Sequence, residues 1–149
     1  MQADSWTALA AGETVDVAQW VPQGVLVRQL GYVKRAETMA KVYSAVDLYC
    51  VTSLADNFPT NVLESMVCGT PVVGFAVGVI PEQVTEECGQ LAVPDDTNAL
   101  GLVIIDLLND DITRQKMREI CRKRAEREYN LQLFIERHIA LYREIVGGG

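Results

Sequence analysis

Short apolar or β-branched runs alternate with segments of helical periodicity from about residue 25 to the end of this chain. Runs this short are typical of strands in the interior of a sheet, because a strand covered on both faces has no polar side. The expected strands are Val25–Leu30, Leu48–Thr52, Pro71–Phe75 and Gln90–Val93. Strands that alternate with helices form parallel sheets covered on both faces. We therefore predict an α/β fold with a parallel sheet and flanking helices.

Apolar side chains recur at helical spacing between these strands and throughout the last third of the chain. The expected helices are Ala36–Ala45, Thr60–Cys68, Pro81–Val84, Thr97–Asn109, Ile112–Tyr129 and Leu131–Val146. Asp96 or Thr97 is the expected N-cap of the fourth helix, and Gly69 stands where a C-cap glycine belongs. We expect the apolar faces of the last three helices to pack over the sheet.

The first 24 residues have no clear periodicity. Trp6 and Trp20 suggest burial, and Pro22–Gly24 suggests a turn. The whole chain, residues 1–149, is interpreted as one partial domain. Within it, Gly147–Gly149 is interpreted as a tag scar or the start of a linker.

The charge balance of the chain excludes several kinds of partner. The formal net charge is −7 and the pI is about 4.7, so we expect no nucleic-acid partner, since binding phosphates needs many basic residues. Seven of the thirteen basic residues lie in Arg114–Arg127, where a nucleic-acid or membrane patch is one interpretation. Interleaved glutamates favour a solvated helix face instead. No apolar run reaches the ~20 residues of a membrane span, and the start lacks the features of a secretory signal.

Cysteine and histidine usage indicates no metal site. Cys50, Cys68, Cys88 and Cys121 are far apart in the sequence, so neither a CxxC motif nor a zinc-finger spacing occurs. Three of them lie in apolar stretches and are expected to be small core residues, reduced and buried in a cytoplasmic protein. His138 is the only histidine and cannot hold a metal alone.

A polar loop and a helix follow the expected strand Leu48–Thr52, and this arrangement suits an anion. Ligands of open parallel sheets bind beyond the carboxyl ends of the strands. The first amides of a helix lack intrahelical partners, and the helix dipole adds positive potential there. Pro59 fits the first helical turn, which leaves the amides of Thr60 and Asn61 free for a phosphate or diphosphate.

Two acidic residues flank this helix start. Glu64 lies one turn into the helix and leans back toward its N-terminus, and Asp56 lies in the loop before it. Carboxylates accept hydrogen bonds from hydroxyl groups, so a phosphate site with two such acceptors describes a nucleotide-sugar. The alternative is that Asp56 or Asn57 caps the helix and Glu64 is a solvated surface residue.

The wider sequence resembles the donor site of retaining group 1 glycosyltransferases, which have the GT-B fold of two Rossmann-like domains. That family has two acidic residues with seven between them, which here are Asp56 and Glu64. Its other motifs resemble DNFP at 56–59, LESMVCGTPVV at 63–73, GVIPE at 78–82 and GQLAVP at 89–94. Upstream, LGYV at 30–33 and YSAVDL at 43–48 resemble the preceding strand and helix of the family. The resemblance implies a Rossmann-like sheet and the C-terminal portion of a donor-binding domain.

The resemblance also implies roles for single residues. Asp56 would be the catalytic residue that contacts hydroxyls of the transferred sugar, and Glu64 would bind the nucleotide ribose. Amides near Thr60 and Asn61 would face the donor diphosphate. Asn57 and Phe58 complete the expected donor-binding set. The nucleotide-sugar is a substrate, so no cofactor and no metal are expected.

The sequence departs from the family in several places. Asp56 stands where Glu is commoner, and Val79 replaces the second glycine of the turn, which bears on the identity of sugar and nucleotide. The family's Arg and Lys that neutralise the leaving diphosphate have no match before Val25, and Lys34 and Arg35 lie in the wrong place.

We therefore expect a fragment that lacks its N-terminal acceptor domain and has no transferase activity alone. A homodimer through the truncated surface is also expected. The whole enzyme would act on polysaccharide or glycolipid acceptors in the cytoplasm or at the cytoplasmic face of a membrane. The alternatives are a sugar-nucleotide epimerase of the same fold and a non-catalytic α/β interaction module.

Overall fold

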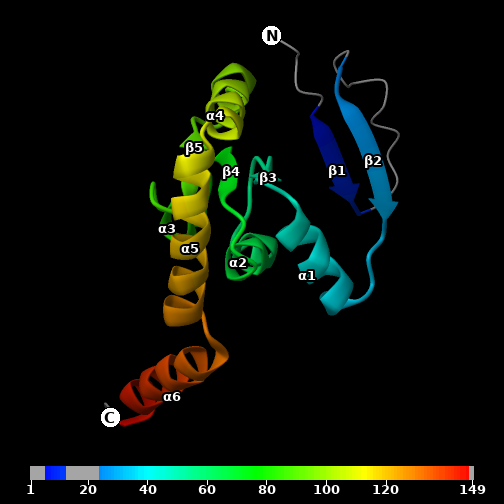
Figure 1. Ribbon diagram of the computed structural model, residues 1–149. Helices are drawn as coiled ribbons and strands as arrows, with labels where there is room; N and C mark the ends of the chain where they lie inside the picture. Colours follow the sequence, from blue (N-terminus) through cyan, green and yellow to red (C-terminus); the bar gives the residue numbers. More distant parts are fainter. Residues whose placement is uncertain (1–5, 13–23, 148–149) are drawn as a thin grey trace. The chain divides into compact units, whose positions relative to one another are not determined.

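The computed structural model describes residues 6–12 and 24–147 (Figure 1). Trp20, the first two residues of the predicted turn at Pro22–Gly24, and the last two of Gly147–Gly149 lie outside the described residues. The chain divides into two compact units, Met1–Lys41 and Val42–Gly149. Each unit is described by itself.

The first unit contains a two-stranded parallel sheet, in which β1 (Thr7–Ala11) pairs with β2 (Leu26–Gly31). The predicted strand at 25–30 is thus confirmed with a shift of one residue. β1 escaped the sequence analysis because an alanine-rich segment has neither alternation nor many β-branched residues. Helix α1 (Ala36–Ala45) begins in this unit and has the predicted bounds.

The second unit contains a three-stranded parallel sheet in the order β3-β4-β5. Its strands are β3 (Tyr49–Val51), β4 (Val72–Phe75) and β5 (Gly89–Ala92). Its helices are α2 (Thr60–Val67), α3 (Ile80–Gln83), α4 (Thr97–Asn109), α5 (Asp111–Glu128) and α6 (Leu131–Gly147). The predicted α/β class with parallel strands and flanking helices is confirmed, although the strands of the described residues form two sheets.

The core of the second unit lies around β4, all of whose residues are buried. α4 packs against β4 and β5, and α2 packs against both the sheet and α5. The large apolar side chains that fill this core come from β4, α2, α3, α4 and α5: Val62, Met66, Val72, Val73, Phe75, Ile80, Leu100, Leu107 and Met117. Removing their surface from water is the main favourable term in folding.

The burial of the cysteines was predicted correctly for Cys88 and Cys121, which lie in the core. Cys50 is exposed and Cys68 is half-buried. The expectation that β3 is buried on both faces is wrong, because Cys50 is exposed and nothing in the described second unit covers its face of the strand. Successive residues of a strand face opposite sides, and only the side of Val51 is buried in β3.

Helix α6 has the predicted periodicity but does not pack over the sheet. None of its side chains is buried, and Phe134, Ile135, Ile139 and Tyr142 are exposed. His138 stacks on Phe134 with 4.0 Å between the ring centroids. An amphipathic pattern reports that a helix has an apolar face, and it does not report which surface covers that face. The expected homodimer stays a prediction.

The basic stretch of α5 is solvated only in part: Arg114 and Arg124 are mostly buried, whereas Arg122 and Lys123 lie on a solvated face with the interleaved glutamates. Arg122 pairs with Glu126 at 3.0 Å and Lys123 with Glu119 at 3.4 Å, all four side chains being more than half exposed. Among the helices of the described residues, none is long and apolar enough to cross a membrane. Within the same residues, no group of three or more His, Cys, Asp or Glu gathers as metal ligands.

Gly69 ends α2 in the predicted way. Its φ is +76°, its amide donates to the carbonyl of Met66 at 2.9 Å, and the amide of Thr70 donates to that of Ser65 at 2.9 Å. These two bonds form a Schellman motif, which satisfies carbonyls that the helix end leaves free. A Cβ on Gly69 would lie 3.3 Å from the carbonyl oxygen of Arg118 in α5. Glycine therefore allows both the turn and the contact between α2 and α5.

We predict that Gly69→Ala lowers the free energy of unfolding by about 1–2 kcal/mol, because a side chain opposes the left-handed conformation. The matched control is Gly101→Ala inside α4, where an added Cβ meets nothing within 4 Å. That control should stabilise by about 0.5–1 kcal/mol, since alanine favours a helix over glycine. Urea unfolding checks both variants, and equal effects on the two would contradict the assignment of Gly69.

Candidate functional site

The loops that follow β3 and β4 meet at the carboxyl edge of the sheet. Gly78, in the loop after β4, has φ +52°, and a Cβ placed there would lie 2.0 Å from the carbonyl oxygen of Asp56. Only a residue without a side chain allows this approach. The GVIPE turn at 78–82 and the loop of Asp56 are therefore packed backbone to backbone, at the edge where parallel sheets bind ligands.

Asp56 organises its own loop. Its Oδ1 accepts a hydrogen bond from the amide of Phe58 at 3.2 Å, which is the geometry of an Asx turn. The N-cap of α2 is Pro59, and no side chain caps that helix end. The alternative in which Asp56 or Asn57 caps α2 is thus wrong. Pro59 itself precedes the first helical turn by one position, so the first helical amide belongs to Thr60.

The start of α2 presents free amides, as predicted. Asn61 Oδ1 accepts from the amide of Val62 at 2.9 Å, which satisfies one of the first donors. Within the described residues, no acceptor binds the amides of Thr60 or Asn61. Both residues are exposed. Two adjacent N–H groups at a helix N-terminus can bind an anionic oxygen.

Glu64 lies one turn into α2, and its exposed side chain has one hydrogen-bond partner among the described residues, Tyr43. The hydroxyl of Tyr43 donates to Glu64 Oε2 at 3.4 Å. Tyr43 is 4% exposed and packs edge-on against Tyr49 with 5.5 Å between the centroids. Burial, then Tyr49 and Glu64, raise the pKa of Tyr43 well above its usual value. The hydroxyl therefore stays protonated and serves as a donor to Glu64.

The charges of both predicted acids, Asp56 and Glu64, act on Tyr49. Burial is the largest cause that raises the pKa of Tyr49 to about 12, and the charges of Glu64 and Asp56 add to it. A hydrogen bond from the Asn61 side chain acts in the opposite direction. Both carboxylates thus lie within electrostatic range of one hydroxyl group beside the start of α2. Sequence reasoning missed Tyr43 and Tyr49, because tyrosines next to a strand usually serve only as core.

The remaining predicted residues, Asn57 and Phe58, lie on the exposed side of the loop. The ring of Phe58 is 51% exposed and contacts Tyr129 with 6.4 Å between centroids. Asp56, Asn61 and Glu64 thus all affect the pKa of Tyr49. Asn57 and Thr60 lie at the surface of the same loop and helix start.

Comparison with known proteins assigns the family. Residues 22–126 match the model of the glycosyl transferases group 1, and this chain belongs to that family. The MMP alpha-(1->4)-mannosyltransferase of Mycolicibacterium hassiacum is 28% identical over 112 residues, which are 74% of this chain and 27% of that protein. The O-antigen chain mannosyltransferase B of Escherichia coli is 36% identical over 89 residues, 60% of this chain and 23% of that protein. The chain thus spans about a quarter of the length of these relatives.

Solved structures confirm the predicted fold. Sucrose-phosphate synthase from Thermosynechococcus elongatus superposes with a TM-score of 0.81 at 27% identity, over 95% of this chain and 39% of that one. Anabaena HepE superposes with a TM-score of 0.78 at 22% identity, over 94% of this chain and 41% of that one. These neighbours are GT-B glycosyltransferases, so the second unit has the architecture that the motifs predicted.

The buried hydroxyl of Tyr43 predicts a pH dependence of stability. Its folded-state pKa lies above the usual value of 10.0, so the unfolded chain loses this proton first. The stabilisation is complete below pH 10 and is lost as the pH rises further, by up to about 1.4 kcal/mol per pH unit. Tyr43→Phe should therefore show a shallower loss of unfolding free energy above pH 10. Urea unfolding across pH 8–11 measures this, at a spacing of about 0.5 pH units.

The matched control is Tyr142→Phe on α6, where the side chain is 62% exposed. It should keep the slope of the wild type. Equal slopes for Tyr43→Phe and the wild type would show that the Tyr43 hydroxyl is not held neutral by the fold.

Proposed function

We propose that this chain supplies the donor-binding part of a glycosyltransferase that moves a hexosyl group from a nucleotide-sugar to an acceptor, with retention of configuration. The observation that carries the proposal is the arrangement around α2. Two free amides at its start lie between Asp56 and Glu64, and both acids act on the same tyrosine. The family supports the proposal, because the residues that match its model, 22–126, include this whole site.

Each part of the site suits one part of the donor. The amides of Thr60 and Asn61, with the dipole of α2, would bind diphosphate oxygens. Glu64, which accepts a hydrogen bond from the Tyr43 hydroxyl, would also accept hydrogen bonds from the ribose hydroxyls. Asp56 would contact hydroxyls of the transferred sugar, with Asn57 and Phe58 lining the same loop. We propose that no metal ion takes part in this binding, because the amides and the carboxylates cover the groups of the donor.

The relatives support the class of donor without assigning the sugar. Two relatives are named as mannosyltransferases, and HepE was solved with UDP-glucose. On these grounds we propose an acceptor of polysaccharide or glycolipid type. The place of action would be the cytoplasm or the cytoplasmic face of a membrane.

Binding by this chain alone should be weak and should lead to no transfer. Within the described second unit, no Arg or Lys side chain makes a hydrogen bond or an ion pair with the loop of Asp56 or the first turn of α2. A charged clamp on the leaving diphosphate is a large contribution to transfer reactions. Amide groups alone can hold the diphosphate but cannot neutralise the charge that develops on it.

The binding prediction is tested by NMR titration of the chain with UDP, GDP and ADP and with their sugar conjugates. Amide shifts should centre on Thr60–Glu64. Glu64→Gln should weaken binding of the best nucleotide about tenfold, because a charge-assisted hydrogen bond is lost. Glu119→Gln on α5 is the control, because Glu119 is an exposed carboxylate in a surface ion pair. No shift with any nucleotide would overturn the proposed donor site.

The variant Asp56→Asn distinguishes the role proposed for Asp56 from the role proposed for Glu64. We expect it to lower the affinity for the nucleotide-sugar and to leave that for the free nucleoside diphosphate unchanged, since Asp56 is assigned to the sugar. The same titration measures both affinities. An equal loss for both ligands would assign Asp56 to the nucleotide instead.

The chain should release no transferred sugar in an assay with radiolabelled donors and lipid or oligosaccharide acceptors. Measured turnover by these 149 residues would contradict the proposal that they carry only the donor-binding part.

A further inference from the structure

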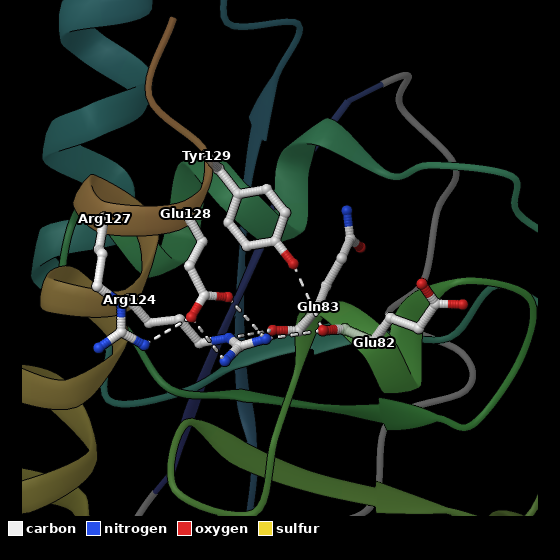
Figure 2. A network of polar contacts seen from close by, with 6 residues as sticks. All are labelled: Glu82, Gln83, Arg124, Arg127, Glu128 and Tyr129. Carbon is white, nitrogen blue, oxygen red and sulfur yellow. Dashed lines mark hydrogen bonds and ion pairs between the residues drawn. The ribbon is translucent and has the colours of Figure 1, made fainter. Parts of the chain in front are cut away.

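A polar network joins the end of α5 to the short helix α3, outside the proposed donor site (Figure 2). α3 spans only Ile80–Gln83, so its last carbonyl groups have no partners of their own within it. Its Gln83 is fully buried, and the side-chain amide has no partner among the described residues. Burying an unpaired amide costs free energy, so α3 depends on contacts from elsewhere to keep its position.

Arg124 of α5 supplies those contacts. Its Nη2 donates to the carbonyl of Glu82 at 2.9 Å and its Nε to the carbonyl of Gln83 at 3.3 Å. Glu128 orients the guanidinium through an ion pair at 3.0 Å. The Arg124 and Glu128 side chains are 18% and 27% exposed, so water screens this pair less than it screens a surface pair.

Tyr129, directly after α5, contacts both α3 and the loop of Asp56. Its hydroxyl donates to the carbonyl of Glu82 at 3.4 Å, and its ring packs against Phe58 with 6.4 Å between centroids. One residue thus touches α3 on one side and the loop of Asp56 on the other.

Two routes therefore lead from the end of α5 to the donor loop, here defined as Asp56–Phe58. The first runs through Arg124 to the carbonyls of α3, and from there through Gly78 to the backbone of Asp56. The second runs through Tyr129 directly to Phe58. Because packed backbones cannot shift independently, a displacement of α3 must move Asp56.

We propose that Arg124 and Tyr129 are positioning residues that hold the donor loop, and that they set the affinity for the transferred sugar more than the affinity for the nucleotide. The inference rests on the proposed function, which assigns Asp56 to the sugar. The diphosphate amides lie on α2, which packs on the sheet and on α5 through other contacts. α2 touches α3 as well, but its larger contact is with α5, so a shift of the donor loop should change the sugar contacts more than the position of the amides.

The test compares Arg124→Gln and Tyr129→Phe with the wild type, in two measurements on the whole chain. In the absence of ligand, both variants should shift the NMR signals of the Asp56 and Phe58 amides. With ligand, the ratio of affinities for UDP-glucose and UDP, or for GDP-mannose and GDP, should fall by about three- to tenfold. Arg124→Lys should recover part of this ratio, since lysine can still donate to one carbonyl.

Arg122→Gln is the matched control, because Arg122 lies on the same helix in an exposed ion pair with Glu126. It should change neither the donor-loop signals nor the affinity ratio. Loss of stability alone would lower both affinities together and leave the ratio unchanged. Tyr129→Phe removes only the hydroxyl contact with the Glu82 carbonyl, with little risk to folding, whereas Tyr129→Leu also removes the ring that packs against Phe58.

The outcomes separate the two proposals. Unshifted signals of Asp56 and Phe58 in both Arg124→Gln and Tyr129→Leu, the variant without the ring, would overturn the positioning role, whatever the ligands do. Shifted signals with an unchanged affinity ratio would overturn the assignment of the donor loop to sugar selection. If the wild type binds none of the nucleotides, the proposed function fails, and the signals without ligand still decide whether Arg124 and Tyr129 hold the loop.

Discussion

Every residue of β4 is buried, and the rest of the second unit is arranged around that strand. β3 and β5 pair with it in parallel on either side, and α2 and α4 pack against it. Because the strands run in the same direction, the loops after β3 and β4 meet at one edge of the sheet. The close approach of Gly78 to the backbone of Asp56 is a direct consequence of that geometry.

The electrostatics of this edge explain how an acidic protein can bind an anion. The positive potential comes from amides at the start of α2, which carry no net charge and need no basic side chain. Asp56 and Glu64 lie close enough to act together on Tyr49. Their place is beside the amides, where hydroxyl groups of a donor would need acceptors. The negative net charge of the chain is therefore compatible with a nucleotide-sugar ligand, although it makes nucleic acid an unfavourable one.

Helix α5 has two different roles along its length. Its middle contributes Met117 and Cys121 to the core, where it packs against α2. Its end reaches α3 through Arg124, which satisfies carbonyls that a four-residue helix cannot satisfy itself. The helix that follows, α6, buries none of its apolar face. The amphipathic pattern is stronger in α6 than in α5, so the burial of α5 and the exposure of α6 arise from their positions in the fold.

Local chemistry was enough to predict the parallel α/β class, the bounds of α1 and α4, the glycine turn at Gly69 and the free amides of α2, because periodicity, caps and glycine turns act over a few residues. β1 was not predicted from the sequence. The expectations that Cys50 and the apolar face of α6 are buried were wrong. The contacts of Tyr49 with the site and of Arg124 with the carbonyls of α3 could not be predicted from the sequence, since both join residues that are far apart in it. Which surfaces meet is decided by packing in three dimensions, and no local pattern encodes it.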